Sequence, residues 1–223
     1  MLRAVALTLC LVLPAVAAQE GKFAVKSAMT AAPKELAADI QKLLAKESIQ
    51  LTDDGGKVIG EFWFRTAIPA DATPEQVKNG ITWREVKQTE VIGAVRFDQD
   101  WTDYRKQKVK AGVYTLRLGY QPADGDHMGS SDFQEFLLVV AADKDKKADL
   151  LDAKHMIELS GSSIGATHPA VFMLSPNPKG AGPGIASAPR NHWVLQSKRD
   201  IVVGGKKTGT SLGIGLNVVG HAE

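Results

Sequence analysis

The most chemically suggestive stretch of the sequence is the loop Asp124-Gly125-Asp126-His127-Met128. Its two carboxylates, Asp124 and Asp126, offer the hard oxygen ligands that Ca²⁺ prefers. The spacing does not match the D-x-D-x-D-G calcium loop. The alternative is a plain turn whose aspartates hydrogen-bond to their own backbone, which is the commoner role of Asp in loops.

Histidine and methionine residues in this loop and in a later one offer another alternative, a metal ion softer than Ca²⁺. His127 and Met128, together with His168 and Met173 from a later loop, supply the imidazole and thioether groups that copper or zinc accepts. The candidate metal ligands are Asp126, His127 and His168. With Asp124 added, the same residues are the candidate ligand-binding residues of the two loops.

A second pattern concerns nucleophilic catalysis. Gly161-Ser162-Ser163-Ile164-Gly165 matches the G-x-S-x-G nucleophile elbow, which works only where a strand turns sharply into a helix. Here a predicted strand, Ala170 to Leu174, follows the motif, so the required context is absent. A hydrolase using Ser163 would also need His168 or His192 within ~3 Å of its hydroxyl.

Three further groups are better explained by structure than by chemistry. The acidic residues of 98–103 lack the glycine and the closing glutamate of a calcium loop. The four tryptophans would form a sugar-stacking platform only on one exposed face, whereas aromatic residues in strands usually pack in the core. Gly204 to Gly209 has the wrong spacing for a phosphate loop and is typical of a hairpin turn. The residues of the first two groups are Asp98, Asp100, Asp103, Trp63, Trp83, Trp101 and Trp193.

The elements that must position these residues are mainly strands. From Val113 to Tyr120 the side chains alternate between two faces, which predicts a half-buried strand. The run from Phe133 to Val140 is apolar on nearly every residue, which is typical of a strand covered on both faces. Together they predict a central hairpin whose tip is the loop of residues 121–132.

Other segments follow the same pattern. The stripe Leu36, Ile40, Leu43 and Leu44 predicts one amphipathic helix over 33–47, after a mobile arm. Further strands are predicted at 48–52, 57–66, 81–86, 90–97, 156–159, 170–174, 192–196, 200–203 and 212–219, and 176–189 is predicted to be a loop. The predicted fold is all-β, a β-sandwich or jelly-roll-like domain over 48–223 with the N-terminal helix packed against it.

Residues 1–18 are predicted to be a secretory signal peptide. Arg3 precedes an apolar stretch of about ten residues, Ala4 to Leu13, and small residues follow at the cleavage site. Residues 19–47 then form the arm and helix. The single cysteine, Cys10, lies in the leader, so the mature chain would contain none and would have no transmembrane segment.

The amino-acid composition and net charge limit the classes of partner that we expect. The net charge is +2 and 44% of the residues are hydrophobic, which is ordinary for a globular protein. So small a charge argues against nucleic acid as a partner.

One segment resembles a known group of proteins. Lys110-Ala-Gly-Val-Tyr-Thr-Leu is similar to the K-x-G-x-Y-x-L core strand of uncharacterised secreted bacterial β-sandwich proteins. Gly125 to Gly129 and Thr167-His168-Pro169 resemble recurring elements of similar exported proteins. The resemblance implies a fold and an exported location, and it assigns no catalytic residue.

We therefore expect a periplasmic or extracellular, non-catalytic module that binds a protein, a glycan or a small ligand through loops 121–132 and 160–169. No cofactor is required by this interpretation. The alternatives are a metal-binding protein and, third, a serine hydrolase.

Overall fold

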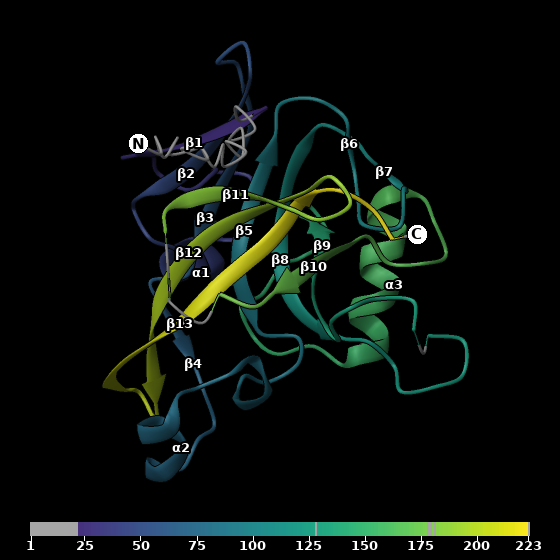
Figure 1. Ribbon diagram of the computed structural model, residues 1–223. Helices are drawn as coiled ribbons and strands as arrows, with labels where there is room; N and C mark the ends of the chain where they lie inside the picture. Colours follow the sequence, from purple (N-terminus) through teal and green to yellow (C-terminus); the bar gives the residue numbers. More distant parts are fainter. Residues whose placement is uncertain (1–21, 128, 178–179, 181, 223) are drawn as a thin grey trace, which may run out of the picture.

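The computed structural model describes residues 22–127, 129–177, 180 and 182–222, and most of them belong to one sheet (Figure 1). Ten strands follow one another in the order β1-β2-β3-β5-β8-β9-β10-β13-β12-β11, and β4 adds a short parallel pairing to β12. The bounds are β1 (Phe23–Ala28), β2 (Ser48–Asp53), β3 (Val58–Phe64), β4 (Ala67–Pro69), β5 (Val91–Phe97), β8 (Gly112–Tyr120), β9 (Glu135–Ala141), β10 (Val171–Ser175), β11 (Gly184–Ala188), β12 (His192–Val203) and β13 (Lys206–Val219). A separate hairpin joins β6 (Trp101–Thr102) and β7 (Lys108–Val109). The all-β prediction is confirmed.

The sheet curls until its first and last strands lie beside each other. β1 lies beside β11, and the ring of Phe23 meets Trp193 edge-on with centroids 5.3 Å apart. The main hydrophobic core fills the inside of the curl, where Phe62, Leu116 and Phe172 are buried. In a sandwich, the strands on opposite sides of the core would belong to two separate sheets. Here they belong to one continuous hydrogen-bonded sheet.

The central hairpin is β8 paired with β9, as predicted. Leu116 lies opposite Val139, and Leu118 lies opposite Leu137, so both strands send large apolar side chains into the core. The outer face of β8, predicted to be open to solvent, is covered as well. Its fully buried Arg117 is the clearest sign of that cover.

Arg117 ties the outer face of the sheet to the connector 142–152. Its Nε and one terminal nitrogen donate to both oxygens of Asp145, at 2.7 and 2.8 Å. The remaining donors reach the carbonyl oxygens of Thr89, Lys147 and Asp149. A guanidinium that is buried and fully hydrogen-bonded fixes the position of the chain that crosses over it.

The N-terminal segment differs from its prediction. The arm contains strand β1, which pairs with β2 from Phe23 opposite Asp53 to Ala28 opposite Ser48. The predicted helix over 33–47 is not confirmed at that length, because only α1 (Ala38–Leu43) is helical. Leu36 and Leu44 pack instead against Trp63 on the outer face of the sheet.

The largest correction is α3 (Ala153–Ile164), which replaces the strand predicted at 156–159 and the first half of the predicted loop at 160–169. Asp152 caps its first turn by accepting a hydrogen bond from the His155 amide, and Gly165 ends it in the left-handed conformation. Gly161 allows the helix to approach the chain that follows, since a Cβ there would lie 2.7 Å from the Ala166 oxygen.

Three shorter segments complete the set of helices and strands. The strand predicted at 81–86 is a single 3₁₀ turn, Trp83–Glu85, held to β8 by the Tyr120 hydroxyl. The loop predicted over 176–189 contains strand β11. The short helix α2 (Pro74–Asn79) lies between β4 and the 3₁₀ turn, with a capping box on Thr73.

The predicted signal peptide, residues 1–18, falls outside the described residues. Within the described part of the chain, no helix is long and apolar enough to span a membrane.

Candidate functional site

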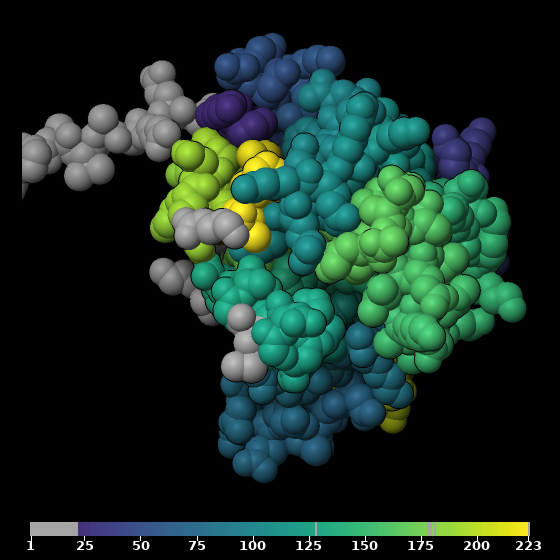
Figure 2. All heavy atoms as spheres, turned by 90° about the vertical axis from the view of Figure 1, so that its right-hand side faces the viewer, coloured from purple at the N-terminus to yellow at the C-terminus, as the bar shows by residue number. Residues whose placement is uncertain are grey.

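A pocket of about 580 Å³ lies on the outer face of the sheet, beside α3. Figure 2 looks onto this side of the molecule, where α3 (green) and the loop of residues 121–132 (teal) reach the surface. The pocket is bordered by that loop, by the turn 103–107, by residues 167–169 and by α3. Loops far apart in the sequence therefore meet around one cavity.

The floor of the pocket is apolar. Phe136 and Leu138 from β9, Met156 from α3 and Val171 from β10 form a small hydrophobic cluster separate from the main core. Gly119 on β8 completes the floor, and a Cβ at this position would overlap the Leu138 side chain. The missing side chain leaves room for the Leu138 side chain, which a larger residue at position 119 would displace.

The turn 103–107 contributes two cationic residues to the rim. The buried Asp103 accepts hydrogen bonds from the Arg105 amide at 2.9 Å, the Gln107 amide at 2.7 Å and the Val171 amide at 3.0 Å, and Gln107 Nε2 adds a fourth at 2.9 Å. Lys106 occupies the left-handed region, with φ 66°. Arg105 and Lys106 are thus exposed side chains on a turn whose backbone is hydrogen-bonded to the buried Asp103.

The loop of residues 121–132 brings His127 to the pocket. Asp124 Oδ1 accepts hydrogen bonds from the amides of Asp126 and His127 and lies 2.7 Å from His127 Nδ1. This last bond is the main reason that the pKa of Asp124 is lowered. Gln121 Nε2 donates to the His127 carbonyl at 2.7 Å and closes the loop. Asp124 therefore has the role that the plain-turn alternative gives it, since it accepts hydrogen bonds from the backbone of its own loop. Asp126 is exposed and does not line the pocket.

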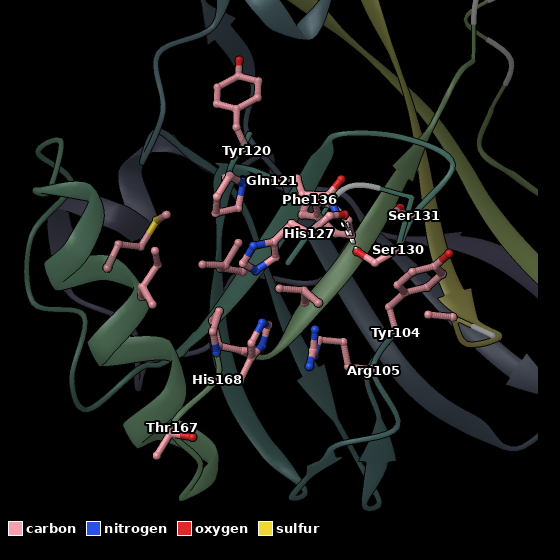
Figure 3. A pocket seen from close by; sticks show the side chains of 18 of the residues that line it. Tyr104, Arg105, Tyr120, Gln121, His127, Ser130, Ser131, Phe136, Thr167 and His168 are labelled. Atoms are coloured by element: carbon pink, nitrogen blue, oxygen red, sulfur yellow. Dashed lines mark hydrogen bonds between the residues drawn. The ribbon is translucent and has the colours of Figure 1, made fainter. Parts of the chain in front are cut away.

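His168 faces His127 from the opposite loop (Figure 3), with ring centroids 6.5 Å apart. Its Nδ1 lies 2.9 Å from the Pro169 carbonyl oxygen, which can only accept, so Nδ1 carries the proton. Burial lowers the pKa of His168, which keeps the ring neutral near pH 7 and leaves Nε2 unprotonated. The two candidate histidines are therefore brought together, without Asp126.

Two methionines were further metal candidates. Met128 falls outside the described residues, and the Met173 sulfur accepts a hydrogen bond from Ser131 at 3.1 Å. Among the residues that the structure describes, no group of three His, Cys, Asp or Glu side chains is arranged to hold a metal ion.

Ser163 lies in the last turn of α3, so a helix precedes it instead of following it. Its hydroxyl donates to the Leu159 carbonyl at 2.7 Å and accepts from the Ala141 amide at 2.9 Å. These bonds fasten α3 to the end of β9. No histidine hydrogen-bonds to Ser163 within the described chain, and His192 bonds instead to the His221 carbonyl.

The remaining sequence candidates have structural roles. Asp98 pairs with Arg96, and Asp100 pairs with Lys108. Trp63, Trp83 and Trp193 are buried, and Trp101 is partly buried against the core, so the tryptophans form no common exposed face. The residues 204–205 form the turn between β12 and β13.

Sequence reasoning missed several residues that line the pocket, above all Arg105, Gly119 and Met156. Nothing local distinguishes them, because each acquires its role only when chain segments far apart meet. The bonds of Asp103 to the following amides are the one local feature, an Asx-type turn, that could have drawn attention to Arg105.

No family model matches the chain, and comparison with curated proteins and with solved structures also found no match. The segment Lys110–Leu116, which carries the resemblance noted above, includes the first half of β8 and contributes no residue to the pocket lining. The functional conclusion therefore depends on the geometry of the pocket.

Proposed function

We propose that this protein is a non-catalytic binding module whose pocket takes a small ligand with an apolar body. The observation that carries the proposal is an open cavity of about 580 Å³ with an apolar floor and a polar rim. Pockets for small molecules combine a largely hydrophobic lining with a few convergent polar groups, in the range of about 300–1,000 Å³. The predicted recognition loops border this cavity.

The polar groups on the rim support binding over catalysis. Ser130 donates to the His127 carbonyl at 2.8 Å, and Ser131 donates to Met173. These hydroxyl groups are engaged in holding the loop of residues 121–132. A nucleophile would instead be hydrogen-bonded to a base positioned to accept its proton.

A neutral apolar fluorophore, N-phenyl-1-naphthylamine, tests the proposal, because its emission rises when it leaves water. Ile157→Trp should weaken probe binding by about tenfold, since residue 157 lines the pocket from an exposed helical position and a Trp would fill the mouth. Leu150→Trp is the matched control: Leu150 is also a partly exposed aliphatic residue, 46% exposed against 36% for Ile157, but lies outside the lining. Equal binding by both variants and the wild type would contradict a ligand site here.

A metal site at His127 and His168 is the second candidate function. The Nδ1 atoms of both rings are engaged, one by a carboxylate and one by a carbonyl, as is usual for histidines whose Nε2 binds a metal. Thermal unfolding with chelator and then with Zn²⁺ or Cu²⁺ tests this function. A metal present at a hundredfold excess over its Kd should add about 2.7 kcal/mol of stability. His127→Ala should abolish that gain, and a gain that survives in this variant would exclude the pair.

We also propose that the protein is exported, because residues 1–18 have the pattern of a secretory signal peptide. Expression in a bacterial host followed by mass spectrometry of the periplasmic fraction should give a chain that begins at Ala18 or Gln19. Recovery of only the uncleaved chain from the cytoplasm would contradict it.

A further inference from the structure

We infer that the ligand of this pocket is an organic acid, with its anionic head bound by Arg105 and its apolar body on the floor formed by β8, β9 and α3. This inference rests on the proposed function and adds the chemical class of the ligand to it. It would make Arg105 the specificity-determining residue of the site.

The charges around the pocket favour an anion. Arg105 and Lys106 line it, and no aspartate or glutamate side chain does so among the described residues. Two acidic groups on the bordering segments are engaged: Asp103 by the amides of its own turn and of β10, and Asp124 by the loop that carries His127. A ligand carboxylate would therefore meet positive charge without a competing negative group.

Among the residues that the structure describes, four arginines have a carboxylate partner, whereas Arg105, like Arg84 and Arg199, has none. Ion pairs are formed by Arg65 with Glu90, Arg96 with Glu61, Arg117 with Asp145 and Arg190 with Asp132. Within the described residues, Arg105 forms none, and it lies on the pocket rim beside His168 (Figure 3). A guanidinium presents paired N–H donors that match a carboxylate or sulfonate head.

The turn that carries Arg105 is organised before a ligand arrives. Asp103 accepts hydrogen bonds from the Arg105 and Gln107 amides of the turn and from the Val171 amide of β10, and Tyr104 donates its amide to the Val171 carbonyl at 2.9 Å. A rim residue on a fixed backbone loses less freedom on binding than one on a mobile loop.

The test compares two probes with the same apolar body. 8-Anilinonaphthalene-1-sulfonate carries an anionic group that N-phenyl-1-naphthylamine lacks. We expect Arg105→Gln to weaken binding of the sulfonate probe by about tenfold or more, from the loss of charged hydrogen bonds. Binding of the neutral probe should stay within about twofold of wild type. Arg105→Lys should fall between, because it keeps the charge but loses the paired donors.

Arg84→Gln is the matched control, because Arg84 is an exposed arginine outside the pocket lining. It should change the binding of neither probe, and thermal unfolding of each variant verifies that the fold is intact. If Arg105→Gln leaves sulfonate binding unchanged while Ile157→Trp still blocks both probes, the anion inference fails and the proposed function stands. If Ile157→Trp affects neither probe, the pocket itself is not a binding site, and both fail.

Discussion

Removing the carboxylate of Asp145 should destabilise the whole fold and not only the connector that carries it. Asp145 is buried and binds Arg117 through two oxygens, and it also accepts the hydroxyl of Thr115. Asp145→Ala would leave a guanidinium in the interior with two donors unpaired. Because that guanidinium lies beneath the chain leading into α3, one wall of the pocket depends on the same pair.

The expected cost follows from the burial. Breaking a buried ion pair by removing one partner costs about 3–5 kcal/mol, since the remaining charge is neither solvated nor paired. The total stability of a domain is about 5–15 kcal/mol, so the loss would be a large fraction of it. Asp145→Asn keeps the shape and one acceptor, and should lose less than Asp145→Ala.

Urea unfolding followed by tryptophan fluorescence measures the effect. With a slope of about 2 kcal/mol per molar urea, Asp145→Ala should lower the midpoint by about 1.5–2.5 M. Arg117→Leu should be similarly destabilised. The double variant Arg117→Leu/Asp145→Ala should be more stable than the sum of the two losses predicts, by about 2 kcal/mol, because no charge remains buried.

Asp71→Ala is the control, because Asp71 forms an exposed pair with Lys87 at 4.0 Å and its side chain is 83% exposed. It should change stability by less than about 1 kcal/mol. Additive losses in the Arg117 and Asp145 cycle, or an Asp145→Ala loss as small as that of Asp71→Ala, would refute the reasoning.

Three further predictions concern single positions. Burial raises the pKa of Tyr120 to about 12 from its usual 10.0, so the hydroxyl stays neutral in the folded protein. The contribution of this group to the free energy of unfolding should be complete below pH 10 and should be lost as the pH rises toward 12. Urea unfolding across that range should show a loss about 1–2 kcal/mol larger in the wild type than in Tyr120→Phe. Gly161→Ala should destabilise by about 1–3 kcal/mol through collision with the Ala166 carbonyl, although Ala in a helix normally stabilises; a rise in melting temperature would contradict the packing described. Gly119→Val should push Leu138 into the pocket and weaken binding of the neutral naphthylamine probe by about tenfold, and unchanged binding would show that this floor is not used.

The hairpins could be predicted from the sequence because their information is local. Strand β8 alternates between two faces, and β2 and β3 flank the turn of residues 53–56, which contains two glycines. Pairing of neighbours along the chain requires only those patterns and a short loop. Phe62 and Trp63 accordingly point to opposite faces, as their positions in the strand require.

Helix α3 could not be predicted in the same way. Its second half, Ser160-Gly161-Ser162-Ser163, is rich in residues of low helix propensity. The helix is held by tertiary contacts: Ser163 bonds to β9, and Ser160 exchanges hydrogen bonds with Ala170 at the start of β10. Strand β1 was missed for a related reason, since its partner β2 lies about twenty residues further on.

The site shows the same division. The sequence alone determined that the chain would be all-β and which two loops would be rich in histidine and aspartate, because strand periodicity and turn chemistry are local properties. Only the tertiary structure decided that His127 and His168 face each other, that Asp126 does not join them, and that Arg105 lines the same pocket as an apolar floor that includes Gly119. A pocket is made by surfaces from separate segments, and their distance in space depends on how the whole sheet curls.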